Sequence, residues 1–407
     1  MRALEGMRVV DFSHVIAGPF CTYQLALLGA EVIKIEEPGT GDYMRSRGGV
    51  EALRQAGMGD HFAIQNGNKR SIAIDLKSSA GLGIARRLTA TADVVVENFR
   101  PGVMQRLGLD HATLSVDNPR LVSLSLSAYG AEGAFAGRPA YDNVVQAAAG
   151  LMAMTGTAES GPLKAGAPVL DYASGTMAAF AVMSALLRRE RTGLGQHVAL
   201  SMMDTAFLLM SPAISSLLNG GKAPVLHAND HALAGASCYE AGDGALIMLG
   251  ACNQRQFDAL CHGIGRPDLL EDPRFADVRQ QDPHRAALAA ILTEEIRRRP
   301  AAEWEAMLAD RVPAARVRPL AEALTESEVL RRGVVQTLPG ELGQRGVTVP
   351  VAAFRADADG PALTDAPPLL SEHRNAILAE LGCDAAEIAS LAEAGAFGGV
   401  EAPIRGR

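Results

Sequence analysis

Short apolar runs alternate with helical patterns along the first part of the chain. Residues 8–12 (RVVDF) and 31–36 (EVIKIE) are apolar runs of strand length. Between them, residues 20–28 have helical periodicity, with Pro19 suited to the helix start and Gly29 to its C-terminal cap. Strand, helix and strand within about 30 residues predict a βαβ unit with parallel strands and a right-handed crossover.

The alternation continues downstream. It predicts strands at residues 71–76, 93–97, 121–127 and 196–200, and helices at residues 78–90, 171–193 and 201–218. The tail adds a strand-like segment, VTVPVAAF, and a helical segment after Pro368. This pattern predicts an α/β fold with a doubly wound, Rossmann-like parallel sheet. Such sheets bind ligands where strand ends face helix starts.

A second domain is indicated by a change of pattern near residue 220. The segment NGGKAPVLHAND resembles a linker, and after it helices and turns alternate less regularly, with repeated prolines. We expect a large domain formed by residues 1–220 and 336–407, and a smaller α+β domain formed by residues 221–335.

Composition narrows the classes of function. The 407 residues are 48% hydrophobic and 4% aromatic, with a net charge of −8, which argues against binding to nucleic acid or anionic membranes. The five cysteines are scattered and form no C-x-x-C pair, so we expect reduced thiols. The N-terminal residues lack a signal-peptide pattern, and no uninterrupted apolar stretch approaches membrane-spanning length. A soluble, cytoplasmic protein is expected.

Several common site motifs are missing. The first turn, SHVIAGP, has one glycine where a dinucleotide-binding turn needs G-x-G-x-x-G, and no P-loop occurs. His227 and His231 lie four residues apart, but HANDH is not H-E-x-x-H, and no Cys/His spacing indicates a metal site. No G-x-S-x-G elbow is present. We therefore expect no metal and no permanently bound cofactor.

Acidic residues beside predicted helix starts are candidates for chemistry. Asp171 opens the long helical stretch DYASGTMAAFAVMSALLRRERTG, where the helix dipole favours an ionised carboxylate near neutral pH. An ordinary N-cap aspartate is the alternative interpretation. Asp42 and Arg45 in GTGDYMR are expected either to form a local ion pair or to bind a ligand.

Several ordered segments together resemble the class III coenzyme A transferases, the family that includes formyl-CoA transferase and carnitine-CoA transferase. The most specific segments are ADVVVENFRPGVMQRLGL at residues 92–109 and RRERTGLGQ at residues 188–196. The segments RVVDFSHVIAGPF, NKRSIAIDLKS, GRPAYDN and GAPVLDYASG add to them, and the resemblance spans nearly the whole chain. It implies an interlocked homodimer whose large domain is built from both ends of each chain.

The resemblance also implies a set of site residues. Asp171 in GAPVLDYASG matches the family's nucleophilic aspartate. Eight further residues match positions in the coenzyme A site: His14, Ala17, Lys77, Asn98, Phe99, Arg106, Arg138 and Tyr141. Glu37 stands where formyl-CoA transferase has an arginine, so one phosphate contact is expected to differ. The glycine-rich loop that covers that enzyme's active site is not visible near residues 235–252, which argues against oxalate as the acceptor.

The implied activity is transfer of coenzyme A from an acyl-CoA, with succinyl-CoA a candidate donor, to a small carboxylic or dicarboxylic acid. A carboxylate such as Asp171 can attack the thioester carbonyl and form a covalent intermediate. The alternatives are a 2-methylacyl-CoA racemase and a non-catalytic acyl-CoA-binding protein. Racemases of this superfamily pair the aspartate with a histidine, whereas Tyr141 stands here, and an unperturbed tyrosine is a poor proton shuttle at neutral pH.

Overall fold

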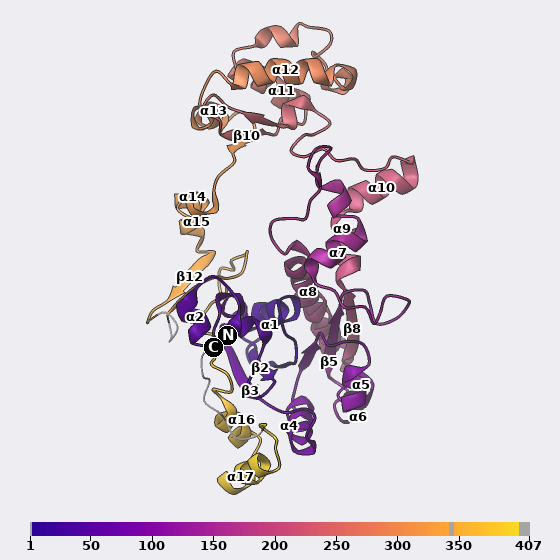
Figure 1. The fold of residues 1–407 in the computed structure, drawn as a ribbon, viewed down its shortest axis with the longest axis vertical. Helices are drawn as coiled ribbons and strands as arrows, with labels where there is room; N and C mark the ends of the chain where they lie inside the picture. The colour runs from indigo at the N-terminus through magenta and orange to yellow at the C-terminus, as the bar shows by residue number, and fades with distance from the viewer. Residues whose placement is uncertain (1, 342–345, 399–407) are drawn as a thin grey trace. The chain divides into compact units, whose positions relative to one another are not determined.

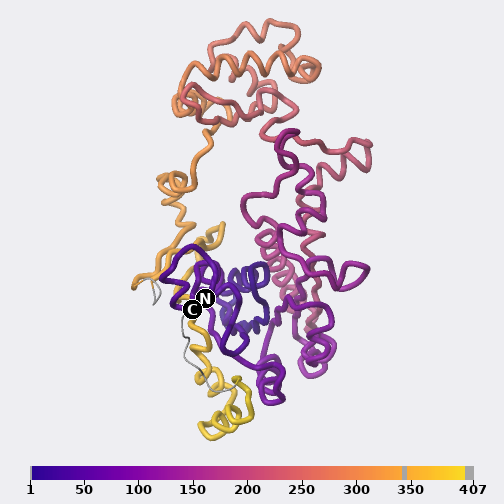
Figure 2. Tube along the Cα trace, viewed as in Figure 1, coloured from indigo at the N-terminus to yellow at the C-terminus, as the bar shows by residue number. Residues whose placement is uncertain are grey.

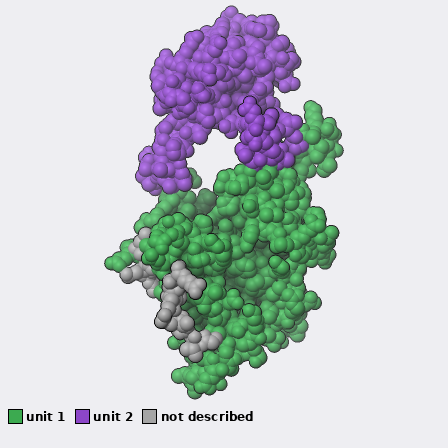
Figure 3. Space-filling model, viewed as in Figure 1, with its two compact units in different colours: residues 1–152, 164–223, 332–407 green, residues 153–163, 224–331 purple. Residues whose placement is uncertain are grey.

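The computed structural model describes residues 2–341 and 346–398. The chain divides into two compact units, drawn in two colours in Figure 3. Unit 1 comprises Met1–Met152, Lys164–Ala223 and Arg332–Arg407, and unit 2 comprises Ala153–Leu163 and Pro224–Arg331. The division lies within four residues of the expected boundaries, except that the short segment 153–163, which the sequence pattern did not separate, groups with unit 2.

The core of unit 1 is a parallel sheet of six strands in the order β3-β2-β1-β4-β5-β8 (Figure 1). The strands are β1 (Arg8–Asp11), β2 (Glu31–Glu36), β3 (Lys69–Ala73), β4 (Val94–Glu97), β5 (Val122–Ser127) and β8 (Gln196–Ser201). All five neighbouring pairs are parallel. Order and direction confirm the expected doubly wound, Rossmann-like sheet, in which the strand order reverses between β1 and β4.

Helices connect these strands, and their ends follow sequence signals. The helix α1 (Ala17–Leu27) joins β1 to β2, and α4 (Ser79–Ala90) begins where the hydroxyl of Ser78 accepts the backbone N–H of Gly81, as expected for a cap. Shorter helices lie in the other connections: α2 (Glu51–Gln55) and α3 (Asp60–Ala63) between β2 and β3, α5 (Val103–Leu107) and α6 (His111–Asp117) between β4 and β5, and α7 (Asp142–Ala149) after β5.

The longest helix, α8 (Val169–Thr192), packs against α1, β5 and β8. A β-carbon at Gly175 would lie 2.6 Å from the carbonyl oxygen of Ala17, so the close approach of α8 to α1 requires glycine there. By length and composition alone, α8 could also cross a membrane, a test that core helices of soluble proteins pass as well. Near the C-terminal end of α8, the guanidinium of Arg189 is buried and pairs with the carboxylate of Asp93 at 2.9 Å.

The prediction of one helix over residues 201–218 was wrong. The segment forms α9 (Met202–Leu209) and α10 (Ser211–Gly220), which are separated at Met210. Pro212 stands in the first turn of α10, where its missing N–H is tolerated. In an uninterrupted helix the same proline would remove an internal hydrogen bond and clash with the preceding turn.

The C-terminal segment belongs to unit 1 and contacts its N-terminal strands (Figure 2). It forms the hairpin β12 (Val335–Leu338) and β13 (Val347–Pro350), then α16 (Arg374–Glu380) and α17 (Ala385–Glu393). The backbone N–H of His373 donates to the carbonyl of Ser71 at 3.0 Å, and Arg70 pairs with Glu380 at 2.7 Å. Both ends of the chain therefore contribute to one unit.

Unit 2 has α and β elements of its own. Its antiparallel sheet contains β9 (Cys238–Glu240), β10 (Leu246–Leu249) and β11 (Ala314–Arg316), with β10 in the centre. The helices α11 (Gln254–Gly263), α12 (Arg285–Ile296) and α13 (Ala301–Leu308) pack with this sheet around a core that includes Trp304. The unit is α+β, as the sequence pattern predicted.

Candidate functional site

The loops after β1 and β4 meet where the strand order of the sheet reverses. The side-chain carbonyl of Asn98 accepts the backbone N–H of His14 at 2.9 Å, and its amide donates to the backbone carbonyl of His14 at 2.8 Å. The ring of His14 lies beside that of Phe99, with 5.6 Å between ring centroids. Such a switch point is where doubly wound sheets bind ligands.

The loop after β1 has an unusual backbone conformation. Val15 has a φ of 74°, in the left-handed region that β-branched residues strongly disfavour. The backbone N–H of Val15 donates to Asp42 at 3.2 Å, and its carbonyl accepts from the amide of Gln65. Contacts on both sides therefore hold a strained residue at the candidate site, as is common in binding sites.

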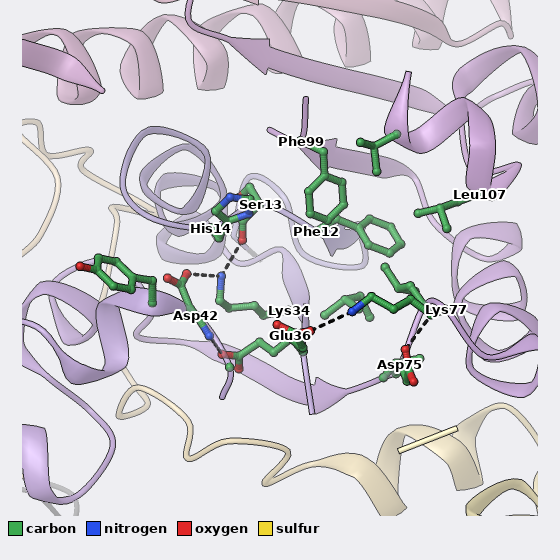
Figure 4. Close-up of a pocket in the computed structure, with 17 residues that line it drawn as sticks. Phe12, Ser13, His14, Lys34, Glu36, Asp42, Asp75, Lys77, Phe99 and Leu107 are labelled. Atoms are coloured by element: carbon green, nitrogen blue, oxygen red, sulfur yellow. Dashed lines mark hydrogen bonds and ion pairs between the residues drawn. The ribbon is translucent and has the colours of Figure 1, made fainter. Parts of the chain in front are cut away.

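Beneath this loop lies a group of buried charged side chains. The ammonium of Lys34 pairs with Asp42 at 3.0 Å and donates to the carbonyl of Ser13 at 2.7 Å (Figure 4). Arg45 pairs with Glu36 at 2.6 Å. The expected ion pair between Asp42 and Arg45 is therefore wrong: each residue pairs with a side chain of β2, because their short loop folds back over that strand.

A cavity of about 440 Å³ opens beside these charges (Figure 4). His14, Phe99 and Lys77 line it, together with apolar side chains. The ammonium of Lys77 lies 3.3 Å from the carboxylate of Glu37, and both side chains are largely exposed. Burial lowers the pKa of His14, which favours its neutral form. The cavity thus combines aromatic surface with a cation whose charge is partly neutralised by Glu37.

A second cavity, of about 310 Å³, shares His14 and Phe99 with the first. It brings together seven of the nine sequence-predicted site residues: His14, Ala17, Asn98, Phe99, Arg138, Tyr141 and Asp171. Lys77 lines only the first cavity. Arg106, in α5, lines neither, although its helix neighbours Val103 and Leu107 line the first.

Asp171 lies in the first turn of α8 and lines the second cavity. It is not the N-cap, because α8 begins two residues earlier, after Pro168. Burial, and next the negative charge of Asp142, raise the pKa of Asp171 to about 7. The expectation that this carboxylate stays fully ionised near neutral pH was therefore wrong. Desolvation and a like charge outweigh the favourable helix dipole.

Sequence reasoning missed how three residues support the site, although Asp142 was a candidate acid and Asp42 a candidate for an ion pair or for ligand binding. The carboxylate of Asp142 accepts the backbone N–H of Asp171 at 3.0 Å, and Lys34 and Asp42 support the loop at Val15. Asp142 stood out in the segment AYDN as a candidate acid, but its hydrogen bonds to the start of α8 were not predicted. Lys34 gave none, because one lysine in an apolar strand is ordinarily exposed.

A third cavity of unit 1, of about 600 Å³, is lined by polar groups that were not predicted to form a site. It includes Glu97, His111 and His197, and the two histidine rings lie 5.8 Å apart. Within residues 2–341 and 346–398, no group of three or more His, Cys, Asp or Glu side chains is arranged to hold a metal ion.

Known proteins resemble this chain along most of its length. The sequence profile of CoA-transferase family III matches residues 4–374. Acetyl-CoA:oxalate CoA-transferase of Acetobacter aceti is 39% identical over 74% of this chain and 76% of its own. Succinyl-CoA:glutarate CoA-transferase of Mus musculus is 31% identical over 94% of this chain and 87% of its own.

A solved structure agrees with these matches. The D→A variant of Rv3272 from Mycobacterium tuberculosis, 33% identical, superposes with a TM-score of 0.82 over 92% of this chain and 98% of its own. A CAIB/BAIF family protein from Brucella suis, 32% identical, gives a TM-score of 0.81. The chain therefore belongs to CoA-transferase family III and is an enzyme with CoA-transferase activity.

Proposed function

We propose that this enzyme transfers coenzyme A from an acyl-CoA to a small carboxylic or dicarboxylic acid through covalent intermediates on Asp171. One observation carries the proposal. Asp171 provides the only carboxylate among the described residues that line the 310 Å³ cavity. A thioester carbonyl in that cavity would therefore meet one carboxylate nucleophile, that of Asp171.

The chemistry proceeds by exchange between a carboxylate and a thiolate. An oxygen of Asp171 attacks the thioester carbonyl, the carbon–sulfur bond breaks, and coenzyme A leaves as a thiolate. The product is a mixed anhydride between Asp171 and the acyl group. The thiolate then attacks the side-chain carbonyl carbon of Asp171, releases the donor acid as a carboxylate, and forms an aspartyl thioester.

The second half reverses these steps with the acceptor. Its carboxylate attacks the aspartyl thioester and displaces the thiolate, which gives a mixed anhydride between Asp171 and the acceptor. The thiolate attacks the acceptor's acyl carbon, and the carboxylate of Asp171 is restored. No net proton or electron is consumed, which suits a site whose described residues include no metal-binding cluster.

The neighbouring cavity supports the placement of the coenzyme. His14 and Phe99 line both cavities, so one extended ligand could pass between them. We propose that the nucleotide occupies the 440 Å³ cavity near Lys77 and that the thioester reaches Asp171. Asn98 would act by fixing the shared loop. Arg138 lines the second cavity, with its guanidinium 4.1 Å from the ring centroid of Phe135, and is a candidate partner for a phosphate or carboxylate.

We propose that the acceptor acid is a small dicarboxylate. Relatives act, by their names, on succinyl-CoA with glutarate or mesaconate and on acetyl-CoA with oxalate. One of these names includes oxalate, so oxalate is also a candidate acceptor, although the sequence lacks a visible glycine-rich loop. Succinyl-CoA and acetyl-CoA should each be tested with glutarate, mesaconate, malate, itaconate, citramalate and oxalate, with products read by mass spectrometry.

Trapping the intermediate tests the covalent step. The enzyme turning over with hydroxylamine should acquire a hydroxamate at Asp171, detected by peptide mass spectrometry. Asp171→Asn should lose turnover by about 10⁴-fold or more and remain unmodified. Asp117→Asn, an exposed change at the end of α6, is the matched control and should behave as the wild type. Full turnover by Asp171→Asn would refute the covalent role.

A racemase is the second candidate, because a carboxyl group with a pKa near 7 is suited to proton transfer. The names of the relatives favour transfer instead. The two are separated by incubating a 2-methylacyl-CoA with the enzyme in D₂O without an acceptor acid. Deuterium at the α-carbon would support racemisation, whereas a transferase should leave that position unlabelled.

We further propose that the enzyme works in the cytoplasm as a homodimer. Exposed large apolar side chains are numerous on α8, α9 and α10: Phe180, Leu187, Phe207, Leu208, Leu209, Leu217 and Leu218. A second copy of the chain is the occupant that the family resemblance implies for these side chains. Light scattering should give twice the 42.6 kDa mass of one chain.

A further inference from the structure

The side chain of Asp142 connects the start of α7 to the start of α8. Its exposed fraction is 7%, and one carboxylate oxygen accepts two backbone N–H groups, from Leu170 at 2.7 Å and from Asp171 at 3.0 Å. Its other oxygen accepts from the side-chain amide of Gln146. A single buried carboxylate thus satisfies two of the N–H groups that every helix leaves unpaired at its start.

Gln146 extends this connection. Its exposed fraction is 1%, and its side-chain carbonyl accepts the backbone N–H of Ala165 at 2.9 Å. The N-cap residue of α8 is Pro168, and no side chain of the N-cap accepts a hydrogen bond there. The side chains of Asp142 and Gln146 therefore hold the backbone on both sides of Pro168. They thereby also hold Asp171, which lines the cavity.

The charges around Asp171 come from several elements. His14, Arg100, Arg138 and Tyr141 line the same cavity, Tyr172 follows on α8, and Asp204 lies on α9. Burial raises the pKa of Asp171 most. Among the charged groups, only Asp142 raises it further. Asp142 is thus the charged group to which the carboxylate of Asp171 responds most.

We propose that Asp142 is a positioning residue for Asp171, fixing the first turn of α8 and placing a negative charge that increases the nucleophilicity of the Asp171 carboxylate. The inference rests on the proposed function. Repulsion between the two carboxylates exists only while Asp171 is ionised. An anhydride or thioester at Asp171 is neutral, so its formation relieves the repulsion and the covalent step becomes more favourable.

The charge and the hydrogen bonds can be separated by two variants. Asp142→Asn removes the charge and keeps an oxygen acceptor for the N–H groups of α8, but its amide nitrogen replaces the oxygen that accepts from Gln146. Gln146→Met keeps the charge and loosens the backbone near Ala165. The readouts are kcat, the KM for acyl-CoA, and the pH profile of kcat/KM, with exposed Asp117→Asn as the control for loss of one negative charge.

For Asp142→Asn we expect the acid limb of the pH profile, where kcat/KM falls as Asp171 becomes protonated, to move by about one pH unit toward lower pH. We also expect kcat at pH 8 to fall about 10- to 100-fold, with the KM for acyl-CoA changed less than threefold. Gln146→Met should lower kcat without moving the acid limb. A purely structural role for Asp142 would give both variants the same unchanged limb, and that result would overturn the inference.

Two outcomes separate this inference from the proposed function. If Asp171→Asn keeps full turnover, the proposed function fails. If Asp171→Asn is inactive but Asp142→Asn keeps the wild-type limb and kcat, the positioning role alone fails. Should Asp142→Asn not fold, carboxyl ¹³C NMR of the wild type decides, with Asp171 assigned by its loss in Asp171→Asn. A midpoint near 4 overturns the role of Asp142. A raised midpoint supports that role when the Asp171 signal also shifts as Asp142 titrates, and a raised midpoint without this coupling overturns it, because burial alone would then account for the pKa.

Discussion

The side chain of Asn98 forms two hydrogen bonds with the backbone of His14, one as acceptor and one as donor. The two residues are 84 positions apart in sequence and follow adjacent strands, β1 and β4. This pair joins the two loops that border both cavities. The next residue, Val15, has the disfavoured φ of 74°, so the pair also helps to hold a strained conformation.

Asn98→Asp should weaken binding of acyl-CoA while leaving the chain folded. The carboxylate keeps an acceptor for the N–H of His14 but places a second oxygen against the carbonyl of His14. We expect the KM for acyl-CoA to rise about tenfold and the free energy of unfolding to fall by about 1–3 kcal/mol. Steady-state kinetics and urea unfolding provide the measurements. Asn118→Asp is the matched control, because the amide of Asn118 donates to the carbonyl of Ala92 at 2.8 Å: this variant should also lose stability but leave the KM unchanged. A KM within twofold of the wild-type value would contradict this role of Asn98.

Asp171→Asn should stabilise the protein, and more so at high pH. An unfolded aspartate ionises near pH 4, whereas folded Asp171 has its pKa raised to about 7. The folded state therefore holds a proton that the unfolded state has lost, and this group makes stability fall as pH rises from about 4 through 7. The loss is at most about 4 kcal/mol, since Asp171 is only partly buried.

The asparagine variant escapes this penalty. Its melting temperature should exceed that of the wild type at pH 8.5 and match it near pH 4, as measured by calorimetry. Asp117→Asn, on the surface, should show no such difference. A gain in melting temperature that is the same at both pH values would mean that Asp171 is not held in its raised-pKa environment.

Lys34→Met should destabilise unit 1 strongly. Lys34 is fully buried and pairs with Asp42, so its removal leaves a buried carboxylate without its cation. Breaking such a pair costs about 3–5 kcal/mol, measurable by urea unfolding. Arg120→Gln breaks an exposed pair with Glu190 and should cost less than about 1 kcal/mol. Similar costs for the two variants would argue that the Lys34–Asp42 pair is not essential to the loop.

Glu37→Gln should improve binding of acyl-CoA. The carboxylate of Glu37 competes with a phosphate for the ammonium of Lys77, and both groups are exposed beside the 440 Å³ cavity. We expect the KM for acyl-CoA to fall about two- to fivefold at low salt, with a smaller change at 0.5 M salt because of screening, where the Debye length is only a few ångströms.

Two controls define this prediction. Glu190→Gln removes one negative charge outside the residues that line the cavity and should leave the KM unchanged. Glu37→Gln combined with Lys77→Ala should lose the gain, because no freed ammonium remains. If the double variant keeps the lower KM, Lys77 is not the group that Glu37 neutralises.

Local patterns predicted the elements of the sheet because their causes are local. The strand β2 occupies residues 31–36 as expected, and Ser78 caps α4, since strand burial and capping depend on neighbouring residues. The break at Met210 between α9 and α10 was missed because a densely apolar run concealed the effect of Pro212. The pairing of Arg45 with Glu36 was missed because a charged side chain's partner depends on how the loop folds.

The sequence by itself determined the parallel α/β fold, the family, and the candidate residues that line the two cavities, because these follow from period, turn chemistry and motif. Only the tertiary structure decided the state of Asp171. Its raised pKa comes from burial and from Asp142, which lies 29 residues earlier and meets it only after α7 and α8 pack. A carboxylate's ionisation depends on solvent and charge in three dimensions, and no run of neighbouring residues encodes either.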